Sequence, residues 1–313
     1  MCKVTVSTYD FFKKFPNEEV ARLHLEQKRW NGEPVCPKCG CIENQYKQKR
    51  DGKEGYYLCY HCKAVYTIRT GTIFERSHVP LHKWMYAIYL IVTARKGISS
   101  LQLSKELGVT QKTAWFMLQR IREACGKDDD NQGGGASLSG IVEVDETFIG
   151  GKEANKHASK KLRQGRGAVG KAIVVGAKQR GGKVIAKHVA DTSAKTLQGF
   201  IGDNIAQGAS VCTDELRSYR GMAGYNHATV NHSAKQFVDG MAHTNSIESV
   251  WAVLKRGFYG IYHAFSAKHL NRYIAEFAFR LNEANCKVHT LERIDAFLCK
   301  IARARITYKA LTA

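Results

Sequence analysis

The sequence predicts an α/β protein, in which a mixed β-sheet with flanking helices follows a cysteine-containing module and a helical region. Three observations carry this prediction. Two Cys-x-x-Cys pairs lie near the N-terminus, and two short amphipathic segments with helix-turn-helix spacing follow them. From residue 139 onward, three strand-like runs precede an alternation of helix and strand patterns. That order is typical of a mixed sheet with helices on both faces.

The composition favours a polyanionic partner. The 313 residues include 48 Lys and Arg against 28 Asp and Glu, a formal net charge of +20. Nucleic acid fits this balance first and an anionic membrane surface second. The sequence shows neither a bilayer-spanning apolar run nor the apolar core of a signal peptide. We therefore expect a cytoplasmic, nucleoid-associated protein with no membrane partner, whose ten cysteines are thiols or metal ligands.

Residues 1–33 form a predicted helical segment, which Pro16 and Asn17 divide into two helices. Residues 34–79 form a predicted zinc ribbon. Two tight turns, each presenting two thiolates and joined by a hairpin with its turn at Asp51 and Gly52, can close a tetrahedral zinc site. The expected ligands of this one structural Zn²⁺ are Cys36, Cys39, Cys59 and Cys62. The spacing makes the nearby Cys41 and His61 bystanders.

Residues 80–126 form a predicted helix-turn-helix region. An apolar helix over 80–96 precedes helices over 101–107 and 112–123, with Thr110 as the N-cap of the last helix. The spacing directs Gln111, Lys112 and Gln119 outward, toward a DNA major groove. An ordinary helical hairpin is the alternative, but the cysteine module and the basic charge favour DNA binding.

Residues 127–138 are acidic and then Gly-rich, so we predict a flexible linker there. The catalytic domain is predicted over 139–300, and a basic tail over 301–313. A basic loop over 152–171 either closes over a phosphate backbone or is a solvated insert. The expected strands cover 139–151, 171–177, 182–189, 209–213 and 227–232. The expected helices cover 193–206, 215–222, 242–257 and 266–282.

Three acids on separate elements of this domain are candidates for metal binding. Asp145 lies in a β-branched strand, Asp214 follows another apolar strand, and Glu248 is on a helix. A single strand Asp is more often solvent-exposed, but three converging acids can bind two divalent metal ions. Asn245 and Lys255 share a helical face with Glu248, and seven residues span about 10 Å of helix. This face can hold both a metal and a DNA phosphate.

From Cys36 to about Asn282, the chain resembles the DDE transposases of bacterial insertion sequences, in the zinc-ribbon group called ISXO-like or IS fifteen-ninety-five. The matching phrases, which follow one another in the same order, are CPKCG, YYLCYHC, TGTIFERSHVPLHKW, VEVDETFIGG, KKLRQGRG, TDELRSY, HTNSIESVWAVLKRGFYGIYH and RYIAEFAFRLN. The resemblance implies a ribonuclease-H-like catalytic domain with two catalytic Mg²⁺ ions, for which Mn²⁺ can substitute.

The resemblance also implies roles for particular residues. Asp145 and Asp214 are the first two catalytic acids, and Lys255 follows the third position. We prefer Glu248 at that position because an anionic ligand holds Mg²⁺ better than an amide does, although some family members use an asparagine, for which Asn245 is the candidate. The implied reaction is hydrolysis at the transposon end and then transfer of its 3′-hydroxyl into target DNA. The implied partners are double-stranded DNA, as terminal inverted repeats and target, and a second copy of the chain in a dimer or larger complex.

Two other functions remain open from the sequence. One is a zinc-ribbon and helix-turn-helix DNA-binding regulator whose catalytic domain is inactive or repurposed. The other is a metal-dependent nuclease that cuts DNA without joining it. The three acids of the catalytic domain argue against the regulator.

Overall fold

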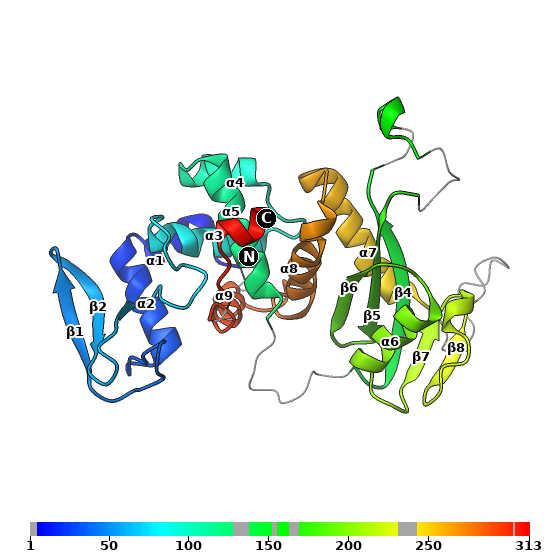
Figure 1. Cartoon of the computed structure of the whole chain (residues 1–313), viewed down its shortest axis with the longest axis horizontal. Coiled ribbons are helices and arrows are strands. Elements are labelled where there is room, and N and C mark those ends of the chain that lie inside the picture. The colour runs from blue at the N-terminus through cyan, green and yellow to red at the C-terminus, as the bar shows by residue number, and fades with distance from the viewer. Residues whose placement is uncertain (1–4, 128–137, 152–154, 163–168, 231–242, 303) are drawn as a thin grey trace. The chain divides into compact units, whose positions relative to one another are not determined.

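The computed structural model describes residues 5–127, 138–151, 155–162, 169–230, 243–302 and 304–313. The chain divides into two compact units (Figure 1). Unit 1 comprises Met1–Asp129 and Glu283–Ala313, and unit 2 comprises Asp130–Asn282. Among the described residues, no helix combines the length and apolar character that crossing a bilayer requires.

Unit 1 begins with two short helices, as predicted. Helix α1 covers Thr8–Lys14 and α2 covers Glu18–Trp30. The side chains of Ser7 and Asn17 cap them by accepting hydrogen bonds from the backbone N–H groups three residues further on. The predicted break at Pro16 and Asn17 is therefore confirmed.

A three-stranded antiparallel sheet follows, in the order β1-β2-β3. Its strands are β1 (Gln45–Arg50), β2 (Lys53–Cys59) and β3 (Val65–Thr67). Asp51 and Gly52 form the predicted hairpin turn, with φ values of 49° and 72°, the left-handed conformation that a two-residue hairpin turn requires. The sheet packs on α2, where the Tyr57 hydroxyl donates to a Glu26 carboxylate oxygen at 2.9 Å.

Three further helices of unit 1 lie close to their predicted positions: α3 (Leu81–Thr93), α4 (Ser100–Leu107) and α5 (Gln111–Cys125). Gly108 ends α4 in the left-handed conformation (φ 61°), and Thr110 caps α5. Gln111 and Lys112 are exposed, as expected.

The expectation that Gln119 faces outward is wrong, because its side chain is fully buried. The physical reason is that the C-terminal half of α5 is enclosed on several sides, not on one apolar face. Arg120, next to Gln119, is also buried, and its guanidinium donates to the carbonyl oxygen of Ile73 at 2.7 Å. A helical period that assumes one buried face misassigns such positions.

The end of the chain belongs to unit 1. Helices α9 (Thr290–Leu298) and α10 (Tyr308–Thr312) follow the boundary at Glu283. The buried Arg293 guanidinium donates to the carbonyl oxygen of Val92 at 2.7 Å, and the Ile73 amide donates to the carbonyl oxygen of Ile301 at 3.2 Å. The predicted catalytic domain over 139–300 is thus too long, and 301–313 is not a separate tail. The packing partners of α9 lie far away in sequence, so its own pattern does not reveal them.

Unit 2 is built on a five-stranded mixed sheet in the order β6-β5-β4-β7-β8. The strands are β4 (Ile141–Ile149), β5 (Ala172–Gln179), β6 (Val184–Val189), β7 (Ser210–Thr213) and β8 (Asn226–Thr229). Strands β4, β5 and β6 are antiparallel neighbours, whereas β7 and β8 run parallel to β4. This confirms the predicted mixed sheet and places β4 at its centre.

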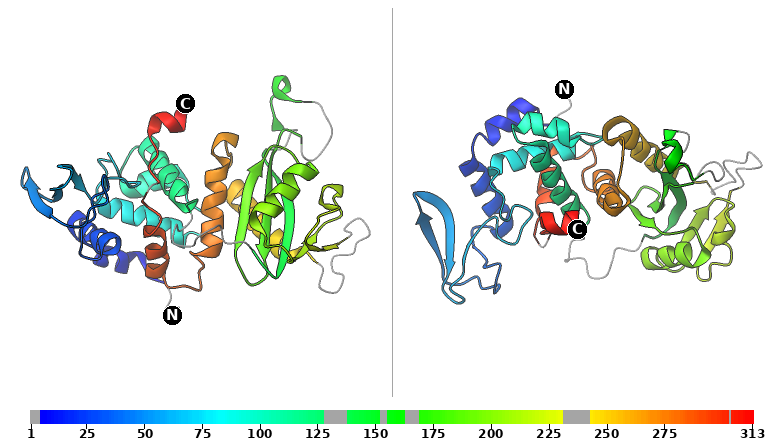
Figure 2. Two further views of the ribbon diagram at one scale, coloured as in Figure 1. Left: turned by 60° about the horizontal axis from the view of Figure 1, so that its bottom comes forward. Right: turned by 45° about the horizontal axis from the view of Figure 1, so that its top comes forward.

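Helices cover both faces of this sheet (Figure 2). Helix α6 (Ala194–Asn204) packs on the face that includes Val142 and Val144. Helices α7 (Asn245–Gly257) and α8 (Leu270–Asn282) pack on the other face, around Trp251 and Phe277. The side-chain amide of Asn282 exchanges two 2.9 Å hydrogen bonds with the Val184 backbone, so α8 lies beside edge strand β6.

Several expectations for unit 2 differ from the structure or fall outside its described residues. The helix expected over 215–222 is a single turn, Arg217–Tyr219. Further single turns cover Ala158–Lys160, Phe258–Tyr262 and Ala267–His269. Residues 128–137 of the predicted linker, 152–154 and 163–168 of the basic loop, and 231–242 around the last expected strand and helix start lie outside the described residues.

Candidate active site and metal centre

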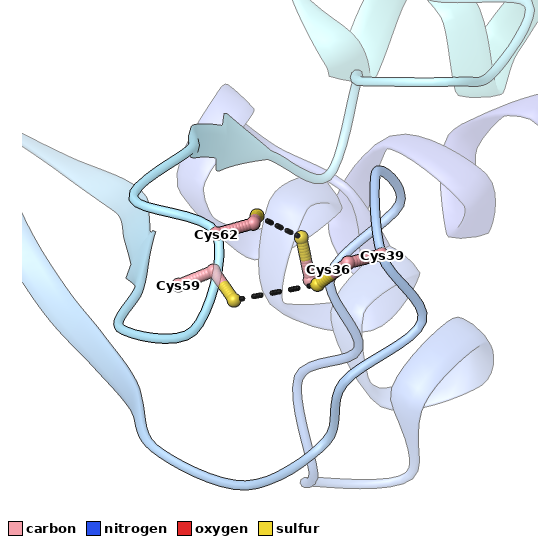
Figure 3. A group of neighbouring side chains, drawn as sticks. All are labelled: Cys36, Cys39, Cys59 and Cys62. Atoms are coloured by element: carbon pink, nitrogen blue, oxygen red, sulfur yellow. Dashed lines mark hydrogen bonds between the residues drawn. The ribbon is translucent and has the colours of Figure 1, made fainter.

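Four cysteines of unit 1 come together as the sequence predicts (Figure 3). The Sγ atoms of Cys36, Cys39, Cys59 and Cys62 all lie within 4.8 Å of one another. The Sγ–Sγ distances are 3.7 Å for Cys36–Cys62 and 3.6 Å for Cys39–Cys59. A tetrahedral site with Zn–S bonds of about 2.3 Å has sulfur atoms about 3.8 Å apart, so the four cysteines fit a zinc ribbon.

The surroundings of the four sulfur atoms shift the pKa values of Cys59 and Cys39 in opposite directions. A backbone hydrogen bond at Cys62, together with contacts that include the Gln45 amide, lowers the pKa of Cys59 to about 6 despite desolvation. A backbone hydrogen bond at Cys41 favours the Cys39 thiolate, but desolvation and the three neighbouring thiols raise the pKa of Cys39 to about 12. A bound divalent cation would reverse that penalty. The Cys41 thiol points elsewhere, donating to the carbonyl oxygen of Glu43 at 3.3 Å.

Two of the predicted acids of unit 2 meet at the centre of the sheet. Strands β4 and β7 are paired in parallel, with Glu143 opposite Cys212. Continued by two residues, to the position just after β7, this register brings Asp145 beside Asp214. Carboxylate oxygens of Asp145, Asp214 and the unpredicted Glu146 all lie within 4.8 Å of one another. The carboxyl ends of parallel strands are where α/β sheets place their binding sites.

The two acids on β4 reach the cluster from opposite faces, as adjacent strand residues must. The Asp145 carboxylate faces α7 and accepts a 2.9 Å hydrogen bond from the indole N–H of Trp251. The Glu146 carboxylate faces the α6 side and accepts a 2.9 Å hydrogen bond from the hydroxyl of Tyr219. Asp214 follows the last residue of β7, where its carboxylate is close to both.

Burial and the charge of neighbouring carboxylates oppose the ionisation of Asp145 and Glu146. Desolvation first and the charge of Asp214 second raise the pKa of Asp145 to about 6. The same two causes raise the pKa of Glu146 to about 7. Partly buried carboxylates this close need a counter-charge to ionise together, and a divalent cation supplies it.

The predicted residues of α7 lie beside this cluster without completing it. Asn245, Glu248 and Lys255 are all exposed, whereas Ile247 and Leu254 are buried, so the predicted separation of helix faces is confirmed. Glu248 is not among the acids that lie within 4.8 Å of one another. Its charge nevertheless contributes to the raised pKa of Asp145. The Thr244 hydroxyl donates to the Glu248 carboxylate at 3.0 Å.

Comparisons with known proteins match both sites. Residues 137–282 match the family model of the ISXO2-like transposase domain, and residues 16–65 match that of the transposase zinc-ribbon domain. Together the two matches span well over half of the chain. The chain belongs to the ISXO2-like transposases. The matched transposase domain ends at Asn282, where unit 2 ends.

A relative from a transposable element matches most of the transposase chain. The "Uncharacterized protein in transposable element ISH50" of Halobacterium salinarum is 28% identical over 283 residues, which are 86% of this chain and 92% of that protein. Among solved structures, the cryo-EM structure of a simian T-cell lymphotropic virus intasome in complex with PP2A regulatory subunit B56 gamma covers 64% of both chains at 14% identity. Its TM-score is 0.27, so that likeness supports no argument about this transposase.

Sequence reasoning missed two acids of the transposase domain, both on the strand that carries Asp145. Glu146 belongs to the acidic cluster, and Glu143 is fully buried beneath the start of α7. The available signal was the density of charge in an otherwise β-branched strand, where Glu143, Asp145 and Glu146 lie within four residues. A carboxylate two residues before Asp145 shares its face of the sheet, and so faces the same helix.

Proposed function

We propose that this chain is a DDE-type transposase that cleaves the ends of an insertion sequence and joins the freed 3′-hydroxyl to target DNA. The single observation that carries the proposal is the convergence of Asp145, Glu146 and Asp214 within a domain of the transposase family. The sheet order, with three antiparallel strands followed by two parallel ones, supports a ribonuclease-H-like fold for unit 2.

The donor set fits Mg²⁺, which prefers carboxylate oxygen ligands. In our proposal Asp145 and Asp214 would hold the metal ions. Glu146 approaches Asp214 from the face of the sheet opposite to Asp145. Two bound Mg²⁺ ions, for which Mn²⁺ can substitute, would activate the attacking hydroxyl and stabilise the leaving oxygen. Trp251 orients the Asp145 carboxylate through its indole N–H. Glu248 on α7 would supply the third metal ligand, with Asn245 as the alternative. Lys255 would contact a DNA phosphate.

Unit 1 is the proposed DNA-recognition unit. Its four-cysteine site would hold one structural Zn²⁺, and the α4–α5 pair would act as a helix-turn-helix motif. Gln111 and Lys112, which are exposed at the start of α5, would contact a major groove. The net charge of +20 favours binding to the phosphate backbone. Terminal inverted repeats and target DNA are the proposed partners, at chromosomal DNA in the cytoplasm, with two or more copies of the chain holding paired ends.

The test is an assay of cleavage and joining with a labelled DNA end and Mg²⁺. We expect both reactions in the wild type, and neither in Asp145→Ala nor in Asp214→Ala. Cleavage without joining would identify a nuclease that does not transpose. Binding without either reaction in the wild type would overturn the enzymatic proposal and leave a DNA-binding regulator.

The third ligand is tested by comparing Glu248→Gln, Asn245→Ala and Glu146→Gln in the same assay. We expect Glu248→Gln to abolish cleavage because an amide replaces an anionic ligand. If only Asn245→Ala abolishes cleavage, the asparagine holds the third position. If only Glu146→Gln does so, the acidic cluster on β4 and β7 is the complete ligand set without α7.

A further inference from the structure

We propose that Glu143 is a positioning residue that holds the first turn of α7, and with it Asn245 and Glu248, in register with Asp145. This inference rests on the proposed function, because it assigns Glu143 to the support of the same metal site. Glu143 lies on the central strand β4, and its side chain has no exposed surface. A carboxylate is buried so completely only where its charge is matched by partners.

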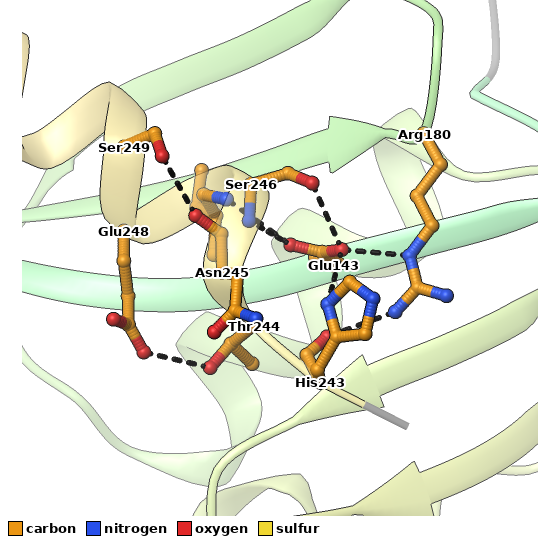
Figure 4. Close-up of polar contacts among 9 residues, drawn as sticks. Glu143, Arg180, His243, Thr244, Asn245, Ser246, Glu248 and Ser249 are labelled. Carbon is orange, nitrogen blue, oxygen red and sulfur yellow. Dashed lines mark hydrogen bonds and ion pairs between the residues drawn. The ribbon is translucent and has the colours of Figure 1, made fainter. Parts of the chain in front are cut away.

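The contacts of Glu143 account for both carboxylate oxygens (Figure 4). Oε2 accepts hydrogen bonds from the backbone N–H groups of Ser246 at 2.7 Å and Ile247 at 3.1 Å. Oε1 accepts from the Ser246 hydroxyl at 3.1 Å and from the Arg180 guanidinium Nε at 2.7 Å. The His243 ring nitrogen Nδ1 lies 3.2 Å from the same oxygen. Most of these partners belong to the first turn of α7, and His243 lies two residues before the helix.

These bonds perform the task that an N-cap side chain normally performs. The first backbone N–H groups of a helix have no partner within the helix. Thr244 is the N-cap residue of α7, but its side chain makes no capping hydrogen bond and donates instead to Glu248. Glu143 supplies the acceptor from another element, and its negative charge suits the positive end of the helix dipole. The cap therefore also docks the helix on the sheet.

Glu143 and Asp145 together fix α7 at two points. Both side chains are on the same face of β4, about 7 Å apart along the strand. Glu143 binds the helix at Ser246 and Ile247, and Asp145 accepts from Trp251 about one turn later. Glu248 lies between these two attachments. A helix held at both points cannot slide or rotate relative to Asp145, so the third ligand stays at a fixed distance from the first.

Arg180 completes the arrangement. Its guanidinium pairs with Glu143 through Nε and donates through Nη2 to the carbonyl oxygen of His243 at 3.1 Å. It thus holds both the carboxylate and the backbone that leads into α7. In Glu143→Gln, the amide NH₂ group would meet the donors of Arg180 or of the helix. The substitution therefore removes the negative charge and one of the two acceptor oxygens, which weakens the hold on α7 without creating a large cavity.

The test compares Glu143→Gln with Glu276→Gln in the full chain. Glu276 is the matched control because it is another fully buried glutamate of unit 2, paired with Arg280 on α8 at 2.6 Å. Both variants are expected to lower the thermal midpoint. Only Glu143→Gln is expected to weaken Mn²⁺ binding, measured by electron paramagnetic resonance, by about 10- to 100-fold, the usual cost of losing a residue that orients a metal ligand.

Amide hydrogen exchange of the metal-free protein is the direct readout of the hold on α7. We expect Glu143→Gln to accelerate exchange in the peptide over residues 243–250, whereas Glu276→Gln leaves this peptide unchanged. The inference would be overturned if this peptide exchanged at the wild-type rate in Glu143→Gln. It would also be overturned if both variants lost Mn²⁺ affinity equally.

A double-mutant cycle decides whether Glu143 acts through the α7 ligand. If it does, Glu143→Gln weakens Mn²⁺ binding in the wild-type background but causes no further loss in Glu248→Gln or Asn245→Ala, whichever removes the third ligand. Independent, additive losses in both backgrounds would overturn the inference. A wild type that binds no Mn²⁺ would instead overturn the proposed function, and the exchange measurement would still decide whether Glu143 holds α7.

Discussion

Gly176 on β5 lies directly against α7, and its substitution by alanine tests the packing of the site. Gly176 is paired with Asp145 across β4 and β5. A Cβ atom built on Gly176 would lie 2.5 Å from Cη2 and 2.9 Å from Cζ2 of Trp251, and 3.2 Å from Cδ1 of Ile247. Trp251 is only 4% exposed, so its ring has no free space into which to move.

The magnitude follows from two opposing contributions. Overpacking a buried site costs about 1–3 kcal/mol. Replacing glycine with alanine restricts the unfolded chain and returns about 0.4–1 kcal/mol. We expect Gly176→Ala to lower the free energy of unfolding by about 1–2 kcal/mol. Displacement of the Trp251 ring also loosens its hydrogen bond to Asp145, so Mn²⁺ affinity should fall as well.

Urea unfolding followed by circular dichroism measures the first effect, and Mn²⁺ titration measures the second. Gly202→Ala is the matched control, because Gly202 is an exposed residue of α6 with no atom within 4 Å of its Cβ position. The same chemical change should there raise the free energy of unfolding by about 0.5–1 kcal/mol. An unchanged stability and Mn²⁺ affinity in Gly176→Ala would refute the close contact between β5 and α7.

Three further predictions concern charge and metal. The pKa of Asp145 is raised from 3.8 to about 6, so the metal-free protein loses stability as the pH rises through this interval. Asp145→Asn should therefore raise the thermal midpoint of the metal-free protein at pH 8 but not at pH 3.5. The same variant should abolish cleavage. Cys59→Ser should eliminate bound zinc, measured by elemental analysis, and accelerate amide exchange over residues 36–67; unchanged zinc content would contradict the four-cysteine site. Lys112→Ala should reduce the slope of log affinity against log salt for terminal-repeat DNA by about 1, whereas an unchanged slope would remove Lys112 from the interface.

The features that sequence patterns predicted are those encoded by neighbouring residues. The Cys-x-x-Cys spacing identified all four sulfur positions, and the apolar alternation located β4 through β7 to within a few residues. The period of α7 also assigned its buried and exposed faces, because one face packs on the sheet and the other does not.

The features that the patterns missed depend on distant partners. From the local pattern, Glu143 is a polar residue on a half-exposed strand. Its burial is favourable only because Arg180 and the start of α7 pack against it in the folded protein. The helical period of α5 predicts that Gln119 faces outward. Gln119 is buried because other elements enclose α5, and the local sequence pattern does not show their packing. Glu146 belongs to the acidic cluster only because Asp214 lies beside it, just after the neighbouring strand β7. Each depends on tertiary placement.

The return of residues 283–313 to unit 1 has a consequence for how the protein is made. Unit 2 is inserted into the chain of unit 1, so the ribosome has synthesised all of unit 2 before α9 emerges. Until then, the Val92 carbonyl oxygen lacks the Arg293 guanidinium as its donor, and the Ile73 amide lacks the Ile301 carbonyl oxygen as its acceptor. Domains generally fold as units during synthesis. Unit 2 can therefore fold first, and unit 1 reaches its complete fold only after residues 283–313 have been translated.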